Sequence, residues 1–388
     1  MTGDTSPRRY RDVWIQISAG EDGVHPVSIE SPAGSLKSTF RSPIPLPDLG
    51  AAISSLERSV VHSGSRSLGD EELEPDSVDA MALGRSLFDS VFQGEPRALL
   101  QANLKDIHTL GEGLRIGLDL RPAGASLAQL PWELMNPPEA SVGHLALDPQ
   151  VSIVRRRSKD VGRRGISAEI PLRVLVAMAS PSDAPLLDLN RERKRIEESW
   201  GTCPGVDLEF LESVTLAELS SALERGAFHV LHYMGHADFT SETNEGVLVV
   251  ETAEGLSDLV GAQVIGELVT REPTLQLVFL NACETAQSGA SRSGQAFTGV
   301  AAAMVDAGVP AVVAMQFKVS DGAAIAFAEH FYDALTREYP VDGAMAEGRR
   351  SVAAQDPRTL EWATPVLFMR SDDGMLFDFE FVYGGVPH

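Results

Sequence analysis

Hydrophobic residues alternate with polar ones near the start of the chain. Between residues 10 and 45 the segments VWIQIS and PVSIESPA alternate in this way, and the turn-forming GEDG separates them. This pattern predicts a small antiparallel sheet. A helix is expected at 49–61, and the polar, acidic segment 64–78 is typical of an exposed loop.

Two helices and a strand are predicted next. The first helix covers about 79–92, and the second begins at Pro96, a residue favoured in the first helical turn. The alternating LRIGLDLRP (114–122) predicts a strand. The basic segment RRRSKDVGRRG (155–165) is typical of a solvated linker, with an activation or self-processing site as the alternative.

From residue 171 onward the apolar residues form nearly continuous runs instead. Such runs are typical of strands that are buried on both faces of a parallel sheet. They are PLRVLVAMASP (171–181), FHVLHYMGH (228–236), TLQLVFLNAC (274–283), AVVAMQF (311–317) and TPVLFMR (364–370).

Helical patterns lie between these runs. The segment Thr215 to Glu218 has the sequence of a capping box, and Ser320 or Asp321 is expected to cap a helix after residue 317. Strands that alternate with helices predict an α/β fold with a central, mostly parallel sheet, preceded by a smaller β-rich region. We therefore divide the chain into residues 1–78, 79–165 and 166–388.

The composition limits the expected classes of binding partner and the expected cellular compartment. The formal net charge is -23, which disfavours direct binding to nucleic acid. Two cysteines, Cys203 and Cys283, are too few for a disulfide framework and fit a reducing compartment. We find neither a secretory signal nor an apolar stretch long enough to span a membrane, so the sequence predicts a cytoplasmic protein without a membrane span.

Two of the predicted parallel strands end in residues that carry chemistry. One ends at His236 and the other at Cys283, 47 residues later. Because ligands bind beyond the carboxyl ends of parallel strands, these side chains can face one another across a cleft. An imidazole lowers the pKa of a nearby thiol and later protonates the leaving amine, which predicts peptide cleavage by a Cys-His dyad. The backbone N–H groups of Cys283 and Ala237 are candidates for the oxyanion hole.

Each of these residues also has an ordinary interpretation. Free cysteine is often a small buried hydrophobic residue, and a histidine at a strand end is often satisfied by a backbone carbonyl. His232 lies on the same strand face as His236, so it competes for the role of base or orients the site. Asn281 either orients the loop of the nucleophile or is satisfied by hydrogen bonding at the strand end.

Other site classes are disfavoured. Tyr233 stands where a zinc protease carries glutamate, and no third ligand follows at a suitable spacing, so we predict no metal and no cofactor. The chain lacks a phosphate-binding loop, so a nucleotide-binding α/β domain is the weakest alternative.

Five motifs, in order, closely resemble the CHAT domain, a caspase-like peptidase domain of bacteria. They are LPWELM (130–135), HVLHYMGHADF (229–239), LVFLNACETAQSG (277–289), AVVAMQFKVSDGAAIAFAEHFYDAL (311–335) and WATPVLFM (362–369). The resemblance implies a caspase–separase-like α/β sandwich. It also implies that 79–165 is a pseudo-protease-like half and that 166–388 is the active half.

The resemblance further implies a thiol protease that cleaves a dedicated protein partner, often in antiviral defence or regulated cell death. Two departures bear on this expectation. Glycine usually follows the catalytic histidine, but here Ala237 does, and activity requires that its φ be negative. No tetratricopeptide repeat is visible, so a separate sensor protein or constitutive activity is expected.

Substrate selection is only weakly encoded. Gln316, Phe317 and Lys318 follow a strand in the region where caspase-like enzymes build part of the substrate pocket. Asp321 would supply a negative charge for a basic substrate residue there, although a position at the start of a helix explains it as well. The competing function is a catalytically silent CHAT scaffold that binds a partner protein.

Overall fold

The structure is a computed structural model of the 388-residue chain. It describes residues 9–65, 79–138, 143–156, 165–185, 187, 189–200, 205–240, 245–282, 293–356 and 358–379. Cys203 and Cys283 lie outside this part of the chain, as do most of the basic segment at 155–165 and of the acidic segment at 64–78.

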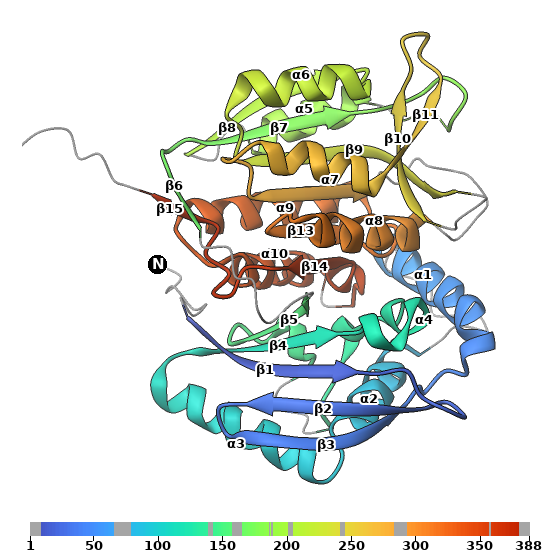
Figure 1. Cartoon of the computed structure of the whole chain (residues 1–388), viewed down its shortest axis with the longest axis vertical. Coiled ribbons are helices and arrows are strands. Elements are labelled where there is room, and N and C mark those ends of the chain that lie inside the picture. The colour runs from blue at the N-terminus through green and yellow to red at the C-terminus, as the bar shows by residue number, and fades with distance from the viewer. Residues whose placement is uncertain are drawn as a thin grey trace, which may run out of the picture.

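A single sheet of 13 strands forms the centre of the described structure (Figure 1). Its middle consists of the parallel strands β7 (Leu172–Met178), β9 (Val230–Phe239), β12 (Leu277–Ala282) and β13 (Ala311–Met315). Strand β8 (Val206–Glu212) extends this group beyond β7. These strands are almost fully buried except β8, which explains their continuous apolar runs.

Strand β14 (Pro365–Met369) runs antiparallel to β13 and joins the two halves of the sheet. Beyond it lie the parallel strands β5 (Val151–Arg156), β4 (Gly113–Asp119) and β1 (Tyr10–Ile17). The antiparallel β2 (Val24–Ser31) and β3 (Gly34–Arg41) complete that side. The predicted N-terminal antiparallel strands therefore exist, but they belong to the central sheet.

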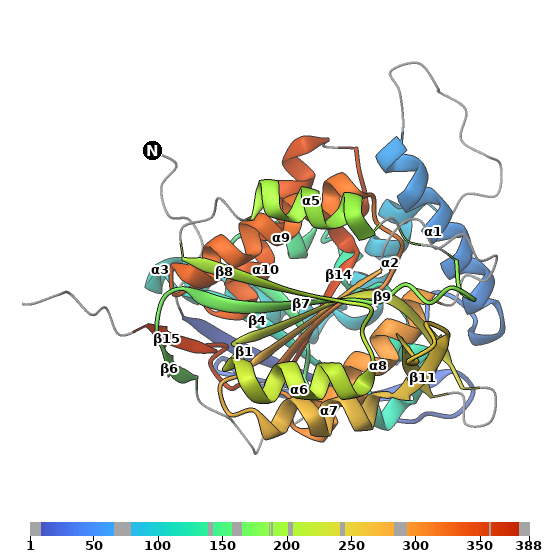
Figure 2. The ribbon, with the colours of Figure 1, turned by 90° about the horizontal axis from the view of Figure 1, so that it is seen from above.

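Helices cover both faces of the part of the sheet formed by β7, β9, β12 and β13 (Figure 2). One face carries α6 (Leu216–Gly226), α7 (Ala262–Arg271) and α8 (Ser293–Ala307), and the other carries α5 (Leu189–Ser199), α9 (Asp321–Thr336) and α10 (Val341–Gln355). The N-terminal part adds α1 (Leu49–Ser65), α2 (Ala80–Val91), α3 (Glu95–Leu110) and α4 (Ala125–Ala128). Short 3₁₀ turns lie at Leu46–Asp48, Arg121–Ala123, Trp132–Leu134 (η3), Leu145–Leu147 and Glu361–Ala363 (η5).

Two small strand pairs complete the fold. A hairpin of β10 (Gly246–Glu251) and β11 (Ser257–Gly261) pairs with the end of β9, and β6 (Ile166–Ala168) pairs with β15 (Phe377–Phe379). Because β10 pairs with β9, the strand predicted to end at His236 continues to Phe239. The sequence pattern did not predict this hairpin.

The predicted α/β class with a mostly parallel sheet and a β-rich N-terminal region is confirmed. The capping box is also present: the Thr215 hydroxyl accepts from the N–H of Glu218 at 3.1 Å, and the Glu218 carboxylate accepts from the N–H of Thr215 at 3.1 Å. Of the two residues proposed to cap the helix after residue 317, Ser320 is the N-cap. None of the described helices is long and apolar enough to cross a membrane.

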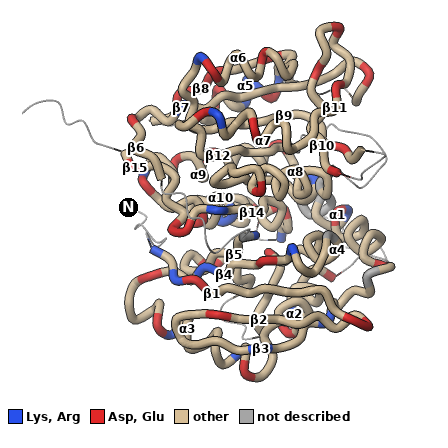
Figure 3. The backbone as a smooth tube through the Cα atoms, in the orientation of Figure 1, with Lys and Arg blue, Asp and Glu red and all other residues tan. Residues whose placement is uncertain are grey.

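The seam between the two halves combines a short strand pairing with buried charges. Strand β14 pairs with β5 through Phe368 with Arg155 and Met369 with Arg156. Close by, Arg115 on β4 forms a 2.6 Å ion pair with Asp342 on α10, and both side chains are almost completely buried. Figure 3 shows basic and acidic residues side by side at the level of β4, β5 and α10.

Candidate functional site

The pairing of β9 with β12 brings the ends of these two strands to the same edge of the sheet. Along this pairing Asn281 is opposite Met234 and Ala282 is opposite Gly235. His236 is the next residue along β9, and Cys283 is the next residue in the sequence after Ala282. Cys283 itself lies outside the described residues.

Among the described residues, the His236 side chain has one hydrogen-bond partner, the backbone carbonyl of Pro185. Its Nε2 lies 2.8 Å from the Pro185 oxygen, in the segment after β7. A carbonyl oxygen can only accept, so Nε2 carries the proton in this hydrogen bond. In the neutral imidazole Nδ1 is then the acceptor, which is the form that a general base requires.

Tyr233 and Gly235 explain the local course of β9. The Tyr233 hydroxyl lies 3.0 Å from the carbonyl oxygen of His236 and 2.7 Å from that of Val249 on β10. A Cβ on Gly235 would lie 2.4 Å from this hydroxyl, so only glycine leaves room for the ring. The residue before the histidine therefore has a steric reason to be glycine.

Ala237 occupies an ordinary strand position in β9. It pairs with Leu248 of β10 and is buried. Among the described residues, the non-glycine positions with positive φ are Asp22, Ser213, Ala227 and Glu338. The steric condition stated for Ala237 in the sequence analysis is therefore met.

His232 lies deeper in the same strand, in an aromatic cluster. Its ring stacks on Phe279 at a centroid distance of 4.5 Å, and its Nδ1 lies 2.9 Å from the Tyr332 hydroxyl. The side chain has no exposed surface, and burial lowers its pKa to about 3. His232 is therefore a neutral core residue beneath the site.

Asn281 is buried near the end of β12. Within the part of the chain that the structure describes, its side-chain oxygen has no hydrogen-bond partner. A buried acceptor without a partner is costly and is unusual in proteins.

The four predicted pocket residues divide into two groups. Gln316 and Phe317 are buried, and the Gln316 amide donates to the Glu133 carboxylate at 3.0 Å and to the carbonyl of Ala363 at 2.7 Å. Lys318 and Asp321 are partly exposed. The structure therefore brings Lys318 and Asp321, rather than Gln316 and Phe317, to the surface.

The charge of Asp321 is already paired. Its carboxylate forms an ion pair with Arg195 of α5, while the neighbouring Ser320 hydroxyl accepts from the N–H of Ala323 and caps α9. Glu192 on α5 lies close by, and burial, with repulsion from Asp321, raises its pKa to about 7. Asp321 is the first residue of α9 rather than its cap.

Three carboxylates that the sequence analysis did not single out hold the segment 316–320. Glu133 of η3 accepts from Gln316, Glu361 of η5 accepts from the N–H of Ser320 at 2.5 Å, and Glu57 of α1 accepts from the N–H of Lys318 at 3.4 Å. The LPWELM motif, which contains Glu133, was the signal for the first of them. Nothing in the pattern around Glu57 or Glu361 indicated such contacts.

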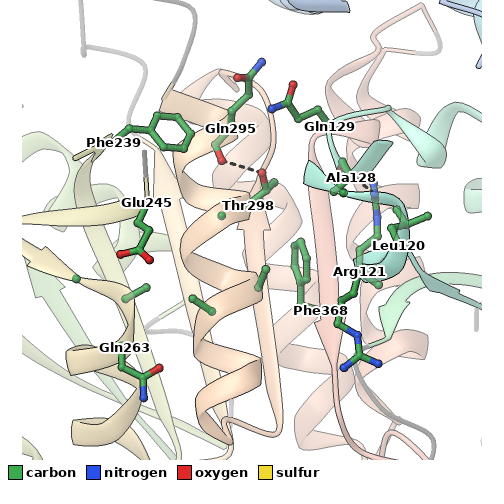
Figure 4. A pocket seen from close by; sticks show the side chains of 18 of the residues that line it. Leu120, Arg121, Ala128, Gln129, Phe239, Glu245, Gln263, Gln295, Thr298 and Phe368 are labelled. Carbon is green, nitrogen blue, oxygen red and sulfur yellow. Dashed lines mark hydrogen bonds between the residues drawn. The ribbon is translucent and has the colours of Figure 1, made fainter. Parts of the chain in front are cut away.

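A groove of about 690 Å³ lies along α8 (Figure 4). Its lining includes Thr298 and Gln295 of α8, Phe239 and Glu245 beside the β9–β10 turn, and Arg121 after β4. Among the described residues, His236 and residues 316–321 do not line it.

No group of three or more His, Cys, Asp or Glu side chains within the described ranges could hold a metal ion.

Comparison with known families gives the identity of the domain. Residues 82–370 match the family described as CHAT domain. This chain belongs to the CHAT domain family. The matched segment begins within α2 and ends after β14, so it includes β9, β12 and the edge where they meet. No curated protein matches the chain in sequence.

Solved structures give more distant matches. Two separase–securin complexes from Saccharomyces cerevisiae share 12% identity with this CHAT chain over 95% and 93% of its length, with TM-scores of 0.47 and 0.48. The chain spans 30% of the length of each matched chain. The complex of the pro- and mature domains of RgpB from Porphyromonas gingivalis shares 14% identity, over 85% of this chain and 77% of that chain, with a TM-score of 0.42.

Proposed function

We propose that this CHAT protein is a cysteine endopeptidase in which Cys283 is the nucleophile and His236 is the general base. The observation that carries the proposal is the hydrogen bond from His236 Nε2 to the Pro185 carbonyl. This bond leaves Nδ1 as the acceptor, as proton abstraction from a thiol requires. The register of β9 with β12 supports the pairing, because Ala282 and Gly235 are opposite one another immediately before the two residues.

The chemical steps follow from this arrangement. Nδ1 of His236 takes the thiol proton, and the thiolate attacks the scissile carbonyl. The N–H groups of Ala237 and Cys283 stabilise the oxyanion, and the imidazolium then protonates the leaving amine. Water hydrolyses the resulting thioester with His236 again as base.

We propose Lys318 and Asp321 as the exposed part of the substrate pocket. The ion pair of Asp321 with Arg195 means that a basic substrate residue would compete with an internal arginine. Gln316 and Phe317 support the pocket from beneath, through the contact of Gln316 with Glu133. Asn281, whose side-chain oxygen has no partner among the described residues, is the proposed support for the loop that carries the nucleophile.

We further propose a dedicated protein substrate and a separate regulatory protein, in a bacterial defence or cell-death system. The family assignment and the acidic net charge of -23 support a protein partner over nucleic acid. The remaining candidate function is a catalytically silent scaffold.

The test is labelling with a thiol-reactive peptide electrophile, in a Cys203→Ser background so that Cys283 is the single cysteine. We expect labelling to be abolished in Cys283→Ala and to be slowed by about 10²–10⁴-fold in His236→Ala, because a positioned base contributes on this scale. Co-expression with genomic neighbours then identifies a protein fragment whose appearance requires Cys283.

The control is His330→Ala, since His330 is an exposed histidine of α9 whose ring bonds, among the described residues, to the carbonyl of Ala326 in its own helix. Labelling that is equally fast in His236→Ala and in the control would exclude the dyad and favour the scaffold.

A further inference from the structure

The segment between β7 and α5 is anchored to the β10–β11 hairpin on both sides of the hairpin turn. The N–H of Ser180 donates to the Glu251 carboxylate at 2.9 Å, at the end of β10. Both the N–H and the hydroxyl of Ser182 donate to the carbonyl of Gly255 at 2.9 Å, within the turn. This segment carries Pro185, the acceptor for His236.

A carboxylate completes the attachment on the far side of the turn. Asp183 accepts from the N–H of Ser257 at 2.8 Å and from its hydroxyl at 2.7 Å, at the start of β11. Within the segment, the N–H of Leu187 donates to the Ser180 hydroxyl at 3.1 Å. Pro185 therefore lies between the points at which the segment is tied, two residues after Asp183.

The same hairpin also holds the backbone of His236. Strand β10 pairs with the end of β9, where Val249 is opposite His236. The Tyr233 hydroxyl contacts the carbonyl oxygens of both residues of this pair. The hairpin thus fixes the backbone of the donor, His236, through β10. It fixes the segment of the acceptor, Pro185, through Glu251, Gly255 and Ser257.

We infer that Asp183 and Ser257 are positioning residues: through the β10–β11 hairpin they hold the Pro185 carbonyl where it sets the tautomer and the orientation of His236. This inference rests on the proposed function, in which His236 acts as base through Nδ1. A small displacement of Pro185 would release Nε2 and allow the imidazole to turn, and misplacement of a reacting group by ~1 Å costs about 10²-fold in rate.

The first readout concerns the histidine alone. In the full-length protein labelled with ¹⁵N-histidine, the side-chain nitrogen shifts of His236 report its tautomer, with His236→Gln to assign the signal. We expect the Nε2–H tautomer in the unmodified chain and a mixture of tautomers in Asp183→Ala. Asp183→Asn keeps an acceptor oxygen and is expected to retain the single tautomer.

The second readout concerns the thiol. The pH dependence of Cys283 alkylation by iodoacetamide is measured by intact mass in the Cys203→Ser background. We expect Asp183→Ala to slow alkylation at pH 6.5 by about ten-fold, the scale on which outer contacts of a functional histidine act. The matched control is Asp356→Ala, which removes a partly exposed carboxylate that accepts from a nearby backbone N–H, that of Arg358.

The outcomes separate the two proposals. An unchanged His236 tautomer in Asp183→Ala overturns the positioning role, whatever the behaviour of the thiol. If the tautomer changes in Asp183→Ala, but His236→Gln alkylates as fast as the unmodified chain, the positioning role is supported and the dyad is excluded. An equal effect of Asp356→Ala on the tautomer also contradicts the inference.

Discussion

Three histidines in and next to β9 show how position decides the chemistry of one residue type. His229 accepts a hydrogen bond from the N–H of Arg173 at 3.0 Å, and burial, together with Arg173, lowers its pKa. His232 is enclosed by aromatic rings, whereas His236 is partly exposed and bonded to Pro185. Only His236 combines access to solvent with a fixed tautomer.

The buried His232 predicts a pH dependence of stability. Its pKa is about 3 in the folded protein and ~6.5 in an unfolded chain, so the unfolded chain binds an extra proton between these values. The stabilisation is complete above pH ~6.5 and is lost as the pH falls toward 3, by up to about 1.4 kcal/mol per pH unit. His232→Phe removes this titration.

Urea unfolding at pH 7.5 and pH 5.5 measures the effect. The unmodified chain should lose about 1.4 kcal/mol more stability than His232→Phe between these two pH values, because the window includes one unit below the unfolded pKa. Equal losses in the two proteins would show that His232 does not titrate differently on folding.

At the scale of elements, the buried central strands were predictable because their residues are apolar on both faces, whereas strand β8 and the helices α7 and α10 were not predicted. The capping box at Thr215 was equally clear, since it requires particular residues at fixed spacing. The β10–β11 hairpin was missed because it is short and pairs with the end of a strand whose apolar run appeared complete at His236.

The candidate site was only partly predictable for a related reason. The choice of His236 as a site residue follows from its position at the end of a predicted strand. Its partner could not be predicted, because every residue has a backbone carbonyl and no sequence pattern indicates which one accepts. The contact of Glu133 with Gln316 joins residues 183 positions apart. Such contacts depend on tertiary packing and not on a local pattern.

At the scale of elements, the buried Glu133 predicts a large effect of one substitution on stability. Its fully buried carboxylate pairs with Arg155 at 2.8 Å and accepts from Gln316, so it links η3, β5 and the segment after β13. Glu133→Gln leaves the buried guanidinium without a counter-charge, and we expect a loss of about 3–5 kcal/mol in unfolding free energy.

Chemical denaturation followed by circular dichroism gives this value. The control is Glu197→Gln, which breaks an exposed ion pair with Arg193 and should cost less than about 0.5 kcal/mol. If Glu133→Gln is as stable as this control, another group must compensate the buried charge of Arg155.

For the whole molecule, the continuous sheet predicts that the two halves unfold together. Strand β14 of the C-terminal half pairs with β5, and Arg115 on β4 pairs with Asp342 on α10. In hydrogen exchange at increasing urea, we therefore expect the amides of β1 and β9 to become exposed in a single global opening. In Asp342→Asn, which leaves Arg115 without its buried counter-charge, β1 should open at a lower urea concentration than β9.

Two separate openings in the unmodified chain would contradict this coupling. Arg193→Gln serves as the control, because its ion pairs are exposed and lie outside the seam.

The contacts across the seam also determine how proteolytic cleavage would affect the molecule. The basic segment at 155–165 begins with the last two residues of β5, so a cut after β5 would separate the covalent chain into two fragments at that point. Those fragments would still share the β5–β14 pairing and the Arg115–Asp342 ion pair, and Arg155 would remain bonded to Glu133. A nicked molecule would therefore elute from a sizing column with the intact protein, and only a denaturing gel would reveal the break.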